Sequence, residues 1–300
     1  MRLTSFQRLA LCTTAATYLL ILVGGLVRAS GAGLGCPDWP RCFGSWIPPA
    51  SAADLPPQFD VSQFNPTLMW TEYLNRLLGI TVGFLILATT VSAWRHHRHE
   101  PRIVWTTTIA LLLTGFQGWL GGRVVAHELA AWIVTVHLVV ALVIVQLLLY
   151  ATVEGFGRAE GRRGKAEAIA IGALIVLTLV QIGIGAQVRG AVDMALDAGI
   201  ARDLALGTVG RLDLLHRDAA FAVLAGAAAF TLWLLWRRAS RRLIRWSFVV
   251  LSLAIIQVLL GVVMAYGSLL PAAQVGHLTT ASLLLGAETL VLLVSRRPDV

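Results

Sequence analysis

The stretch "WTEYLNRLLG" at residues 70–79 has a counterpart later in the chain, "LDLLHRDAAF" at residues 212–221. Each stretch begins a long apolar run and carries an acidic residue, two further residues, a polar residue and then an arginine. The polar residue is Asn75 in the first copy and His216 in the second. Because the frame is kept while one side chain differs, the two stretches indicate that the chain contains two copies of one unit.

Further polar positions recur at nearly the same spacing. Asn75 and His216 are 141 residues apart, and two other matched pairs are 140 residues apart. The matches are Gln117 in "QGWLGG" with Gln257 in "QVLLG", His137 in "TVHL" with His277 in "VGHL", and "GGLVR" at 24–28 with "GAQVR" at 185–189. Polar matches at a near-constant offset in an apolar chain predict a duplicated unit. Four spans in each unit place the two units in parallel topology, related by an axis along the membrane normal.

The composition is that of a membrane protein. Of the 300 residues, 57% are hydrophobic and 13% are charged, and the mean hydropathy is +0.76; soluble domains carry about 25% charged residues. Eight apolar runs can each cross a bilayer core of about 30 Å. They lie at about residues 9–27, 68–94, 103–124, 130–152, 167–188, 213–236, 246–267 and 274–294. The sequence therefore predicts an all-α integral membrane protein with eight transmembrane helices in two pseudosymmetric four-helix bundles.

The basic residues sort to one side of these spans. Sixteen of the 24 Lys and Arg residues lie near the two termini and in the loops after the second, fourth and sixth spans. Because short basic loops stay cytoplasmic, we expect both termini inside a bacterial inner membrane and loops 28–67, 125–129, 189–212 and 268–273 outside. The net charge of +8 is thus explained by topology and by contact with membrane lipid, and nucleic-acid binding is excluded. The predicted domains are residues 1–153, a cytoplasmic linker at 154–166, and residues 167–300.

Three histidines lie within predicted spans, at His137, His216 and His277. Ionisable residues within a membrane are costly and usually functional. Two imidazoles facing each other across a four-helix bundle commonly hold haem iron, whereas zinc prefers three or four ligands. Structural hydrogen bonding and a proton relay are the alternatives.

Charged residues accompany the histidine positions. Arg76 and Arg217 follow the repeated polar position, and Arg28 and Arg189 lie at the ends of the first span of each half. Guanidinium groups are suited to the propionates of haem, although interfacial arginines also occur without a ligand. Glu72 lies on the same helix face as Asn75; it is predicted either to act in proton transfer or to form a salt bridge with Arg76.

Two cysteines lie in the first outer loop, in "GLGCPDWPRCFGSW". We expect Cys36 and Cys42 to form a disulfide, because the outer side is oxidising in a bacterium. The pair serves either as a structural link within the loop or as a redox-active pair beside a cofactor site.

Across nearly its whole length the chain resembles the haem A synthase family, called CtaA in bacteria and Cox15 in mitochondria. The resemblance is carried by "GGLVRASGAGLGCPDWPRCFGSWIPP", "EYLNR", "GFQGWLGGRVV", "TVHL", "LLHR" and "VGHL". It implies an enzyme that oxidises a methyl group of haem O to the formyl group of haem A, with haem O as substrate in the first bundle and haem b in the second. It also implies partners, namely a haem O synthase and cytochrome oxidase assembly factors. A homo-oligomer and the electron donor remain open.

This chain departs from the family pattern at one ligand position. The family has two histidines in each half, and His216 with His277 completes the haem b pair, but Asn75 replaces the partner of His137. An amide is a poor iron ligand, so the first site would be open on one face, beside Glu72. Natural adaptation, a degenerate site and an introduced substitution all explain Asn75. A non-catalytic membrane cytochrome b and a haem-handling protein are therefore the alternative functions.

Overall fold

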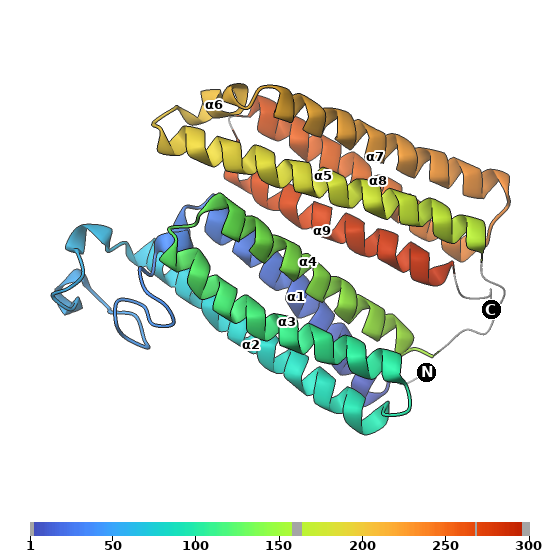
Figure 1. Ribbon diagram of the computed structural model, residues 1–300, viewed down its shortest axis with the longest axis horizontal. Helices are drawn as coiled ribbons and strands as arrows, with labels where there is room; N and C mark the ends of the chain where they lie inside the picture. The colour runs from blue at the N-terminus through green and yellow to red at the C-terminus, as the bar shows by residue number, and fades with distance from the viewer. Residues whose placement is uncertain (1–2, 158–163, 268, 296–300) are drawn as a thin grey trace. The chain divides into compact units, whose positions relative to one another are not determined.

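The computed structural model describes residues 3–157, 164–267 and 269–295. The chain divides into two compact units, Met1–Gly155 and Phe156–Val300 (Figure 1). In the described residues secondary structure is helical apart from one isolated bridge between Cys42 and Ser45.

The first unit is a closed ring of four long helices. They are α1 (Ser5–Ala29), α2 (Pro66–His96), α3 (Pro101–Ala126) and α4 (Ala131–Glu154). Each helix packs on the next, and α4 returns to α1. Local sequence explains where two of them start: Thr4 forms a capping box with Gln7, and Asn65 caps α2 ahead of Pro66 in its first turn.

The second unit repeats this ring. It consists of α5 (Lys165–Asp197), α7 (Arg211–Trp236), α8 (Arg241–Tyr266) and α9 (Pro271–Val294), with the short α6 (Arg202–Ala205) between α5 and α7. Here α5 packs on α7, α7 on α8, α8 on α9, and α9 returns to α5. The order of neighbours is thus the same in both units.

One buried contact occurs at equivalent positions of the two units. The hydroxyl of Thr90 on α2 donates to the carbonyl of Thr107 on α3 (3.0 Å), and the hydroxyl of Thr231 on α7 donates to the carbonyl of Ser247 on α8 (3.3 Å). These residues are offset by 141 and 140 positions, as are the polar pairs noted above. The duplication therefore extends to hydrogen bonds between helices.

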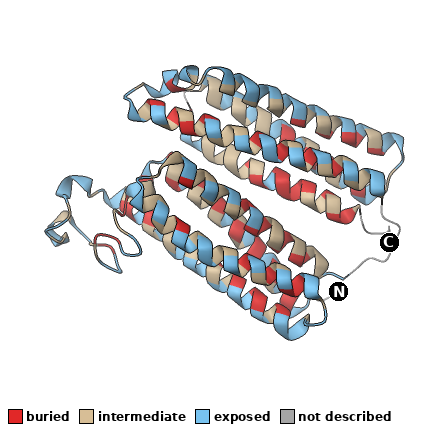
Figure 2. Ribbon diagram, in the orientation of Figure 1, coloured by how far each residue is buried: buried red, intermediate tan, exposed pale blue. Residues whose placement is uncertain are grey.

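Burial follows the inner face of each ring, as Figure 2 shows. In the first unit, Ile86 and Leu148 are buried, while Phe84 and Leu112 on neighbouring turns are 67% and 68% exposed. Large apolar side chains on the outer surface suit a lipid environment rather than water. All eight long helices are long and apolar enough to cross a membrane. The predicted fold class is confirmed: this is an all-α integral membrane protein.

The fifth helix is longer than the sequence predicts. It continues past residue 188 to Asp197, and α6 lies within the predicted loop 189–212. The added turns contain an i,i+4 ion pair in which Arg189 Nη2 lies 2.7 Å from Asp193 Oδ1. Hydropathy marks where the apolar run ends, and it does not mark where the helix ends.

Candidate functional site

The second unit brings two of the predicted ligands together. His216 on α7 and His277 on α9 have ring centroids 6.3 Å apart, with an angle of 62° between the ring planes. Each lies in the second turn of its helix. Both Nδ1 atoms are buried and form no hydrogen bond of normal geometry with the described residues. Buried polar atoms normally have partners, so this pair is arranged for something besides packing.

Glycines provide the space for these rings. A Cβ at Gly185 on α5 would lie 2.8 Å from Cε1 of His216, closer than real side chains approach. A Cβ at Gly261 on α8 would lie 3.6 Å from Cε1 of His277. In addition, the Nε2 of Gln181 donates to the carbonyl of His216 (3.0 Å), which fixes α7 against α5 at this level.

The histidine pair fits haem iron between its rings. Two metal–imidazole bonds of about 2 Å each, with the ring radius added at both ends, span a centroid separation of about 6 Å. Two imidazoles on facing helices are a common axial ligand set for haem. Within residues 3–157, 164–267 and 269–295, no group of three or more His, Cys, Asp or Glu could hold a metal ion. The donor set therefore suits haem better than a structural zinc.

The first unit contains half of the corresponding arrangement. His137 on α4 lies next to Gly121 on α3, whose added Cβ would be 3.8 Å from the ring, and its carbonyl accepts from Gln117 Nε2 (3.1 Å). Asn75 on α2 has a buried Oδ1 without a hydrogen bond to the described residues. Gly24 on α1 corresponds to Gly185, yet a Cβ there would meet nothing within 4 Å. The glycine that makes room for an imidazole is present, but the imidazole is not.

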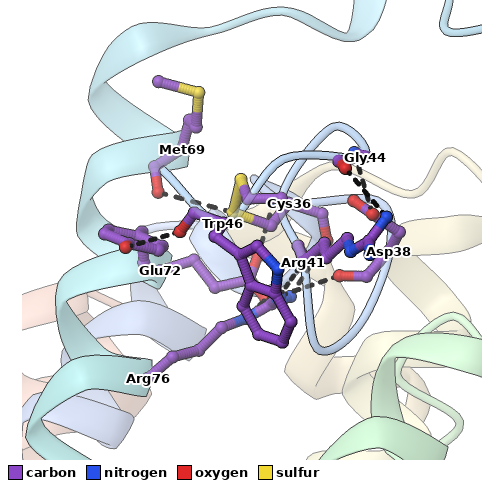
Figure 3. Close-up of a disulfide and its surroundings, with 10 residues drawn as sticks. Cys36, Asp38, Arg41, Gly44, Trp46, Met69, Glu72 and Arg76 are labelled. Atoms are coloured by element: carbon purple, nitrogen blue, oxygen red, sulfur yellow. Dashed lines mark hydrogen bonds and ion pairs between the residues drawn. A yellow bond between two sulfur atoms is a disulfide. The ribbon is translucent and has the colours of Figure 1, made fainter. Parts of the chain in front are cut away.

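Cys36 and Cys42 are joined in a disulfide that fastens the first outer loop to α2 (Figure 3). Both cysteines are fully buried. The backbone N–H of Cys36 donates to Glu72 Oε2 (2.7 Å), and the hydroxyl of Tyr73 donates to the carbonyl of Trp46 (2.7 Å). The loop therefore covers the outer end of α2, where Glu72 and Asn75 lie.

Arg76 completes this attachment, as Figure 3 shows. It is hydrogen-bonded to the carbonyls of Cys36 (3.1 Å), Asp38 (2.8 Å) and Arg41 (2.8 Å). Its Nε donates to Glu72 Oε1 (3.1 Å), and its Nη2 pairs with the same oxygen. All five N–H donors of a guanidinium are thereby engaged. The salt bridge between Glu72 and Arg76, one of the two predicted alternatives, is present.

The other three candidate arginines lie in different surroundings. Arg217 pairs with Asp213 (2.6 Å), and its side chain is 43% exposed. Arg189 pairs with Asp193 and also donates to the amide oxygen of Gln274 on α9. Arg28 lies in the last turn of α1 and is half-buried.

The sequence analysis did not single out several of these groups. The attachment of the loop to Glu72 and Arg76 depends on tertiary contacts between residues about 40 positions apart, for which the sequence contains no local signal. Glu288 is a buried acid in the eighth span, and its signal was available, because an ionisable residue within a span is a functional candidate by default.

Comparison with known proteins agrees with this architecture. Residues 7–289 match the family model COX15-CtaA, described as cytochrome oxidase assembly protein. A "Heme A synthase" of Allorhizobium ampelinum is 30% identical over 212 residues, covering 62% of this chain and 56% of the relative. A "Heme A synthase" of Rhizobium johnstonii is 29% identical over 214 residues, covering 62% and 55%. One from Cereibacter sphaeroides is 29% identical over 312 residues, covering 85% and 78%.

The chain thus spans little more than half the length of the first two of these relatives. The family match nevertheless includes all eight long helices, up to the last turn of α9, and both histidine regions. The chain therefore belongs to the COX15-CtaA family of cytochrome oxidase assembly proteins.

Proposed function

We propose that the protein is a haem A synthase, an oxidoreductase that converts the methyl group on one pyrrole of haem O to the formyl group of haem A. The observation that carries the proposal is the histidine pair, His216 and His277, whose rings are 6.3 Å apart inside a family with this printed role in cytochrome oxidase assembly. The relatives named "Heme A synthase" support it.

In this proposal the second bundle binds haem b. His216 and His277 would be its axial ligands, with Gly185 and Gly261 leaving room for their rings. Arg189 and Arg217 are the proposed partners of the propionates, because both lie at the same end of the bundle as the histidines. Bound haem b would supply one-electron transfer, and the chain's own residues hold it between helices that exclude water.

The first bundle is the proposed site for haem O. His137 would be the protein ligand on one face, and Asn75 would leave the opposite face open, which suits oxygen chemistry. Arg28 is the proposed propionate partner. Arg76 is assigned to this site as well, and its hydrogen bonds to three loop carbonyls mean that it also positions the disulfide loop.

Glu72 is the proposed catalytic residue of the first bundle. Its Oε2 accepts the N–H of Cys36 and its Oε1 accepts from Arg76, so these contacts orient the carboxylate. Each carboxylate oxygen has a second lone pair, so the group can still accept a proton at the reacting side.

The proposal also covers location and partners. We place the protein in a bacterial inner membrane with both termini cytoplasmic, as the basic loops indicate. A haem O synthase would supply the substrate, assembly factors of cytochrome oxidase would receive the product, and assembly as a homo-oligomer is included in the proposal.

The test is the identity of the haems. Haems extracted from the purified full-length protein, produced together with a haem O synthase, should be haem b with haem O or haem A on chromatography. His137→Ala should lose haem O and haem A while keeping haem b, and His127→Ala, a histidine outside the bundle core, should change neither. Haem b alone in the unmodified protein would contradict the proposal and favour the membrane cytochrome b.

A further inference from the structure

Glu288 on α9 is a fully buried acid in the middle of the second bundle. It is 0% exposed, and the hydroxyl of Thr178 on α5 donates to its Oε1 (2.8 Å). Its Oε2 is also buried and has no hydrogen-bond partner among the described residues. A carboxyl group with a single partner in the bundle core calls for an explanation beyond packing.

The surroundings of Glu288 are apolar, which makes the acid costly. Its neighbours on α9, Ala287 and Val291, belong to the main core cluster of this bundle. The same cluster includes Leu174, Val223, Ala227, Phe230 and Leu284. An isolated carboxylate in such an environment costs several kcal/mol, whereas a leucine would fill the space without that cost. The equivalent position in the first bundle, 140 residues earlier, is Leu148.

Glu288 shares a helix face with a proposed haem ligand. His277, Ala281, Leu284 and Glu288 follow one another at intervals of four, three and four residues, so they line one face of α9. The acid lies eleven residues inward from His277, about 16 Å along the helix axis. Helical side chains lean toward the N-terminus of their helix, so the carboxyl group of Glu288 leans toward His277.

A cavity of about 20 Å³ lies between the histidine pair and the acid. Its walls include Thr178, Gln181 and Gln257, and the α9 residues Ala281 and Leu284. This volume is sufficient for about one water molecule. Because Gln181 and Gln257 both have an amide oxygen without a hydrogen bond to described residues, the cavity provides polar partners in an otherwise apolar bundle.

The α5 helix makes the same connection from the opposite side. Thr178, Gln181 and Gly185 lie on one face of α5. Thr178 binds Glu288, Gln181 donates to the carbonyl of His216, and Gly185 contacts the His216 ring position. Hydroxyl, amide and imidazole groups thus lead from the acid to the histidine pair.

No other ionisable group lies at the level of Glu288 on any of the four helices. Residues 168–188, 219–236, 246–265 and 278–287 contain no Asp, Glu, His, Lys, Arg, Cys or Tyr. On the outer side the next titratable groups toward the site are His216 and His277. On the inner side Glu167 and Arg237 lie 3.8 Å apart as an ion pair. A change of charge at the histidine pair would therefore act on Glu288 through a medium of low polarity.

We infer that Glu288, hydrogen-bonded by Thr178, is a proton-binding site linked to the oxidation state of the haem held by His216 and His277. The inference rests on the proposed haem b site. When a reductant adds one electron to the ferric iron, the positive charge that favours the Glu288 carboxylate is lost. The carboxylate then takes up one proton from solvent to become a carboxylic acid, so one electron and one proton enter together.

The test combines redox titration with infrared spectroscopy on the purified full-length protein. The midpoint potential of the haem that depends on His216 and His277 should fall as pH rises, and Glu288→Gln should remove most of that pH dependence. The infrared difference between reduced and oxidised protein should contain a carboxylic-acid carbonyl band that is absent in Glu288→Gln. Thr178→Val should shift this band, and Thr178→Ser should retain it.

Glu167→Gln is the matched control, because it also converts a carboxyl group of this bundle to an amide but lies at the inner end of α5. It should leave both the pH dependence and the band unchanged. A haem spectrum with a potential that responds to pH equally in Glu288→Gln and in the unmodified protein would overturn the inference and leave the proposed function intact. The absence of any haem that depends on His216 and His277 would overturn both.

Discussion

The two bundles share a helix order and a polar frame, but they differ at the position that faces the proposed haem. In the second bundle His216 occupies that position, and a Cβ at Gly185 would collide with its ring at 2.8 Å. In the first bundle Asn75 takes its place, and a Cβ at Gly24 would meet nothing within 4 Å. The space for a second imidazole is thus kept on the side of the bundle that lacks it.

The bundles also differ in what covers the neighbouring ion pair. Glu72 and Arg76 are held beneath the disulfide loop, with side chains 6% and 13% exposed. The equivalent Asp213 and Arg217 also pair, but the arginine is 43% exposed. The comparison teaches that a duplicated frame can be specialised by one ligand and one loop, giving a closed site in one copy and an open, covered site in the other.

The largest expected effect comes from removing a ligand of the closed site. His216→Ala should abolish the low-spin optical and electron-paramagnetic-resonance signal of a haem with two imidazole ligands, because the iron cannot keep two strong-field ligands. His277→Ala should do the same, and His127→Ala is the surface control. If the low-spin signal survives in both single variants, the assignment of these ligands is wrong.

The second effect separates the two ion pairs. Arg76→Ala leaves the buried carboxylate of Glu72 and three loop carbonyls without their donor, so it should cost about 3–5 kcal/mol of stability. Arg217→Ala removes a pair open to solvent and should cost about 0–1 kcal/mol. The thermal denaturation midpoint of the detergent-solubilised protein measures both. Equal losses in the two variants would show that the disulfide loop adds nothing to the first pair.

These contrasts also mark how far the sequence alone can lead. Eight spans and a duplicated frame could be predicted, because apolar run length and residue spacing are properties of the sequence itself. The continuation of α5 to Asp197 could not, because polar turns beyond the apolar run are held by Arg189 and its partners. The binding of Arg76 to carbonyls about 40 residues earlier and the contact of Gly185 with His216 depend on tertiary packing.

A third effect is a change of spin state in the first bundle. Asn75→His should move its haem toward low spin, because Gly24 leaves room for an imidazole opposite His137. Measuring the change in a His216→Ala background avoids overlap with the other haem. Two fully low-spin haems in the unmodified protein would contradict the prediction, because another residue would then close the first site.

Activity of the same variant distinguishes the origins of Asn75. If the open position is an adaptation, the unmodified protein forms haem A and Asn75→His does so no better. If Asn75 has inactivated the site, Asn75→His recovers haem A formation. Glu72→Gln, tested in whichever form is active, should lower the rate, since its carboxylate is the proposed proton acceptor.

The smallest effect tests the glycines from which the comparison began. Gly24→Ala should raise stability by about 0.5–1 kcal/mol, the usual gain in a helix interior, without changing either haem spectrum, because the added methyl meets nothing within 4 Å. Gly185→Ala gains the same helix preference but pushes against the His216 ring, so it should weaken the low-spin signal of the second bundle. Adding Gly24→Ala to Asn75→His should then reduce the shift toward low spin, since the new imidazole would meet the methyl that Asn75 does not reach. If Gly24→Ala alone disturbs a haem as much as Gly185→Ala does, the first bundle does not hold an open imidazole position.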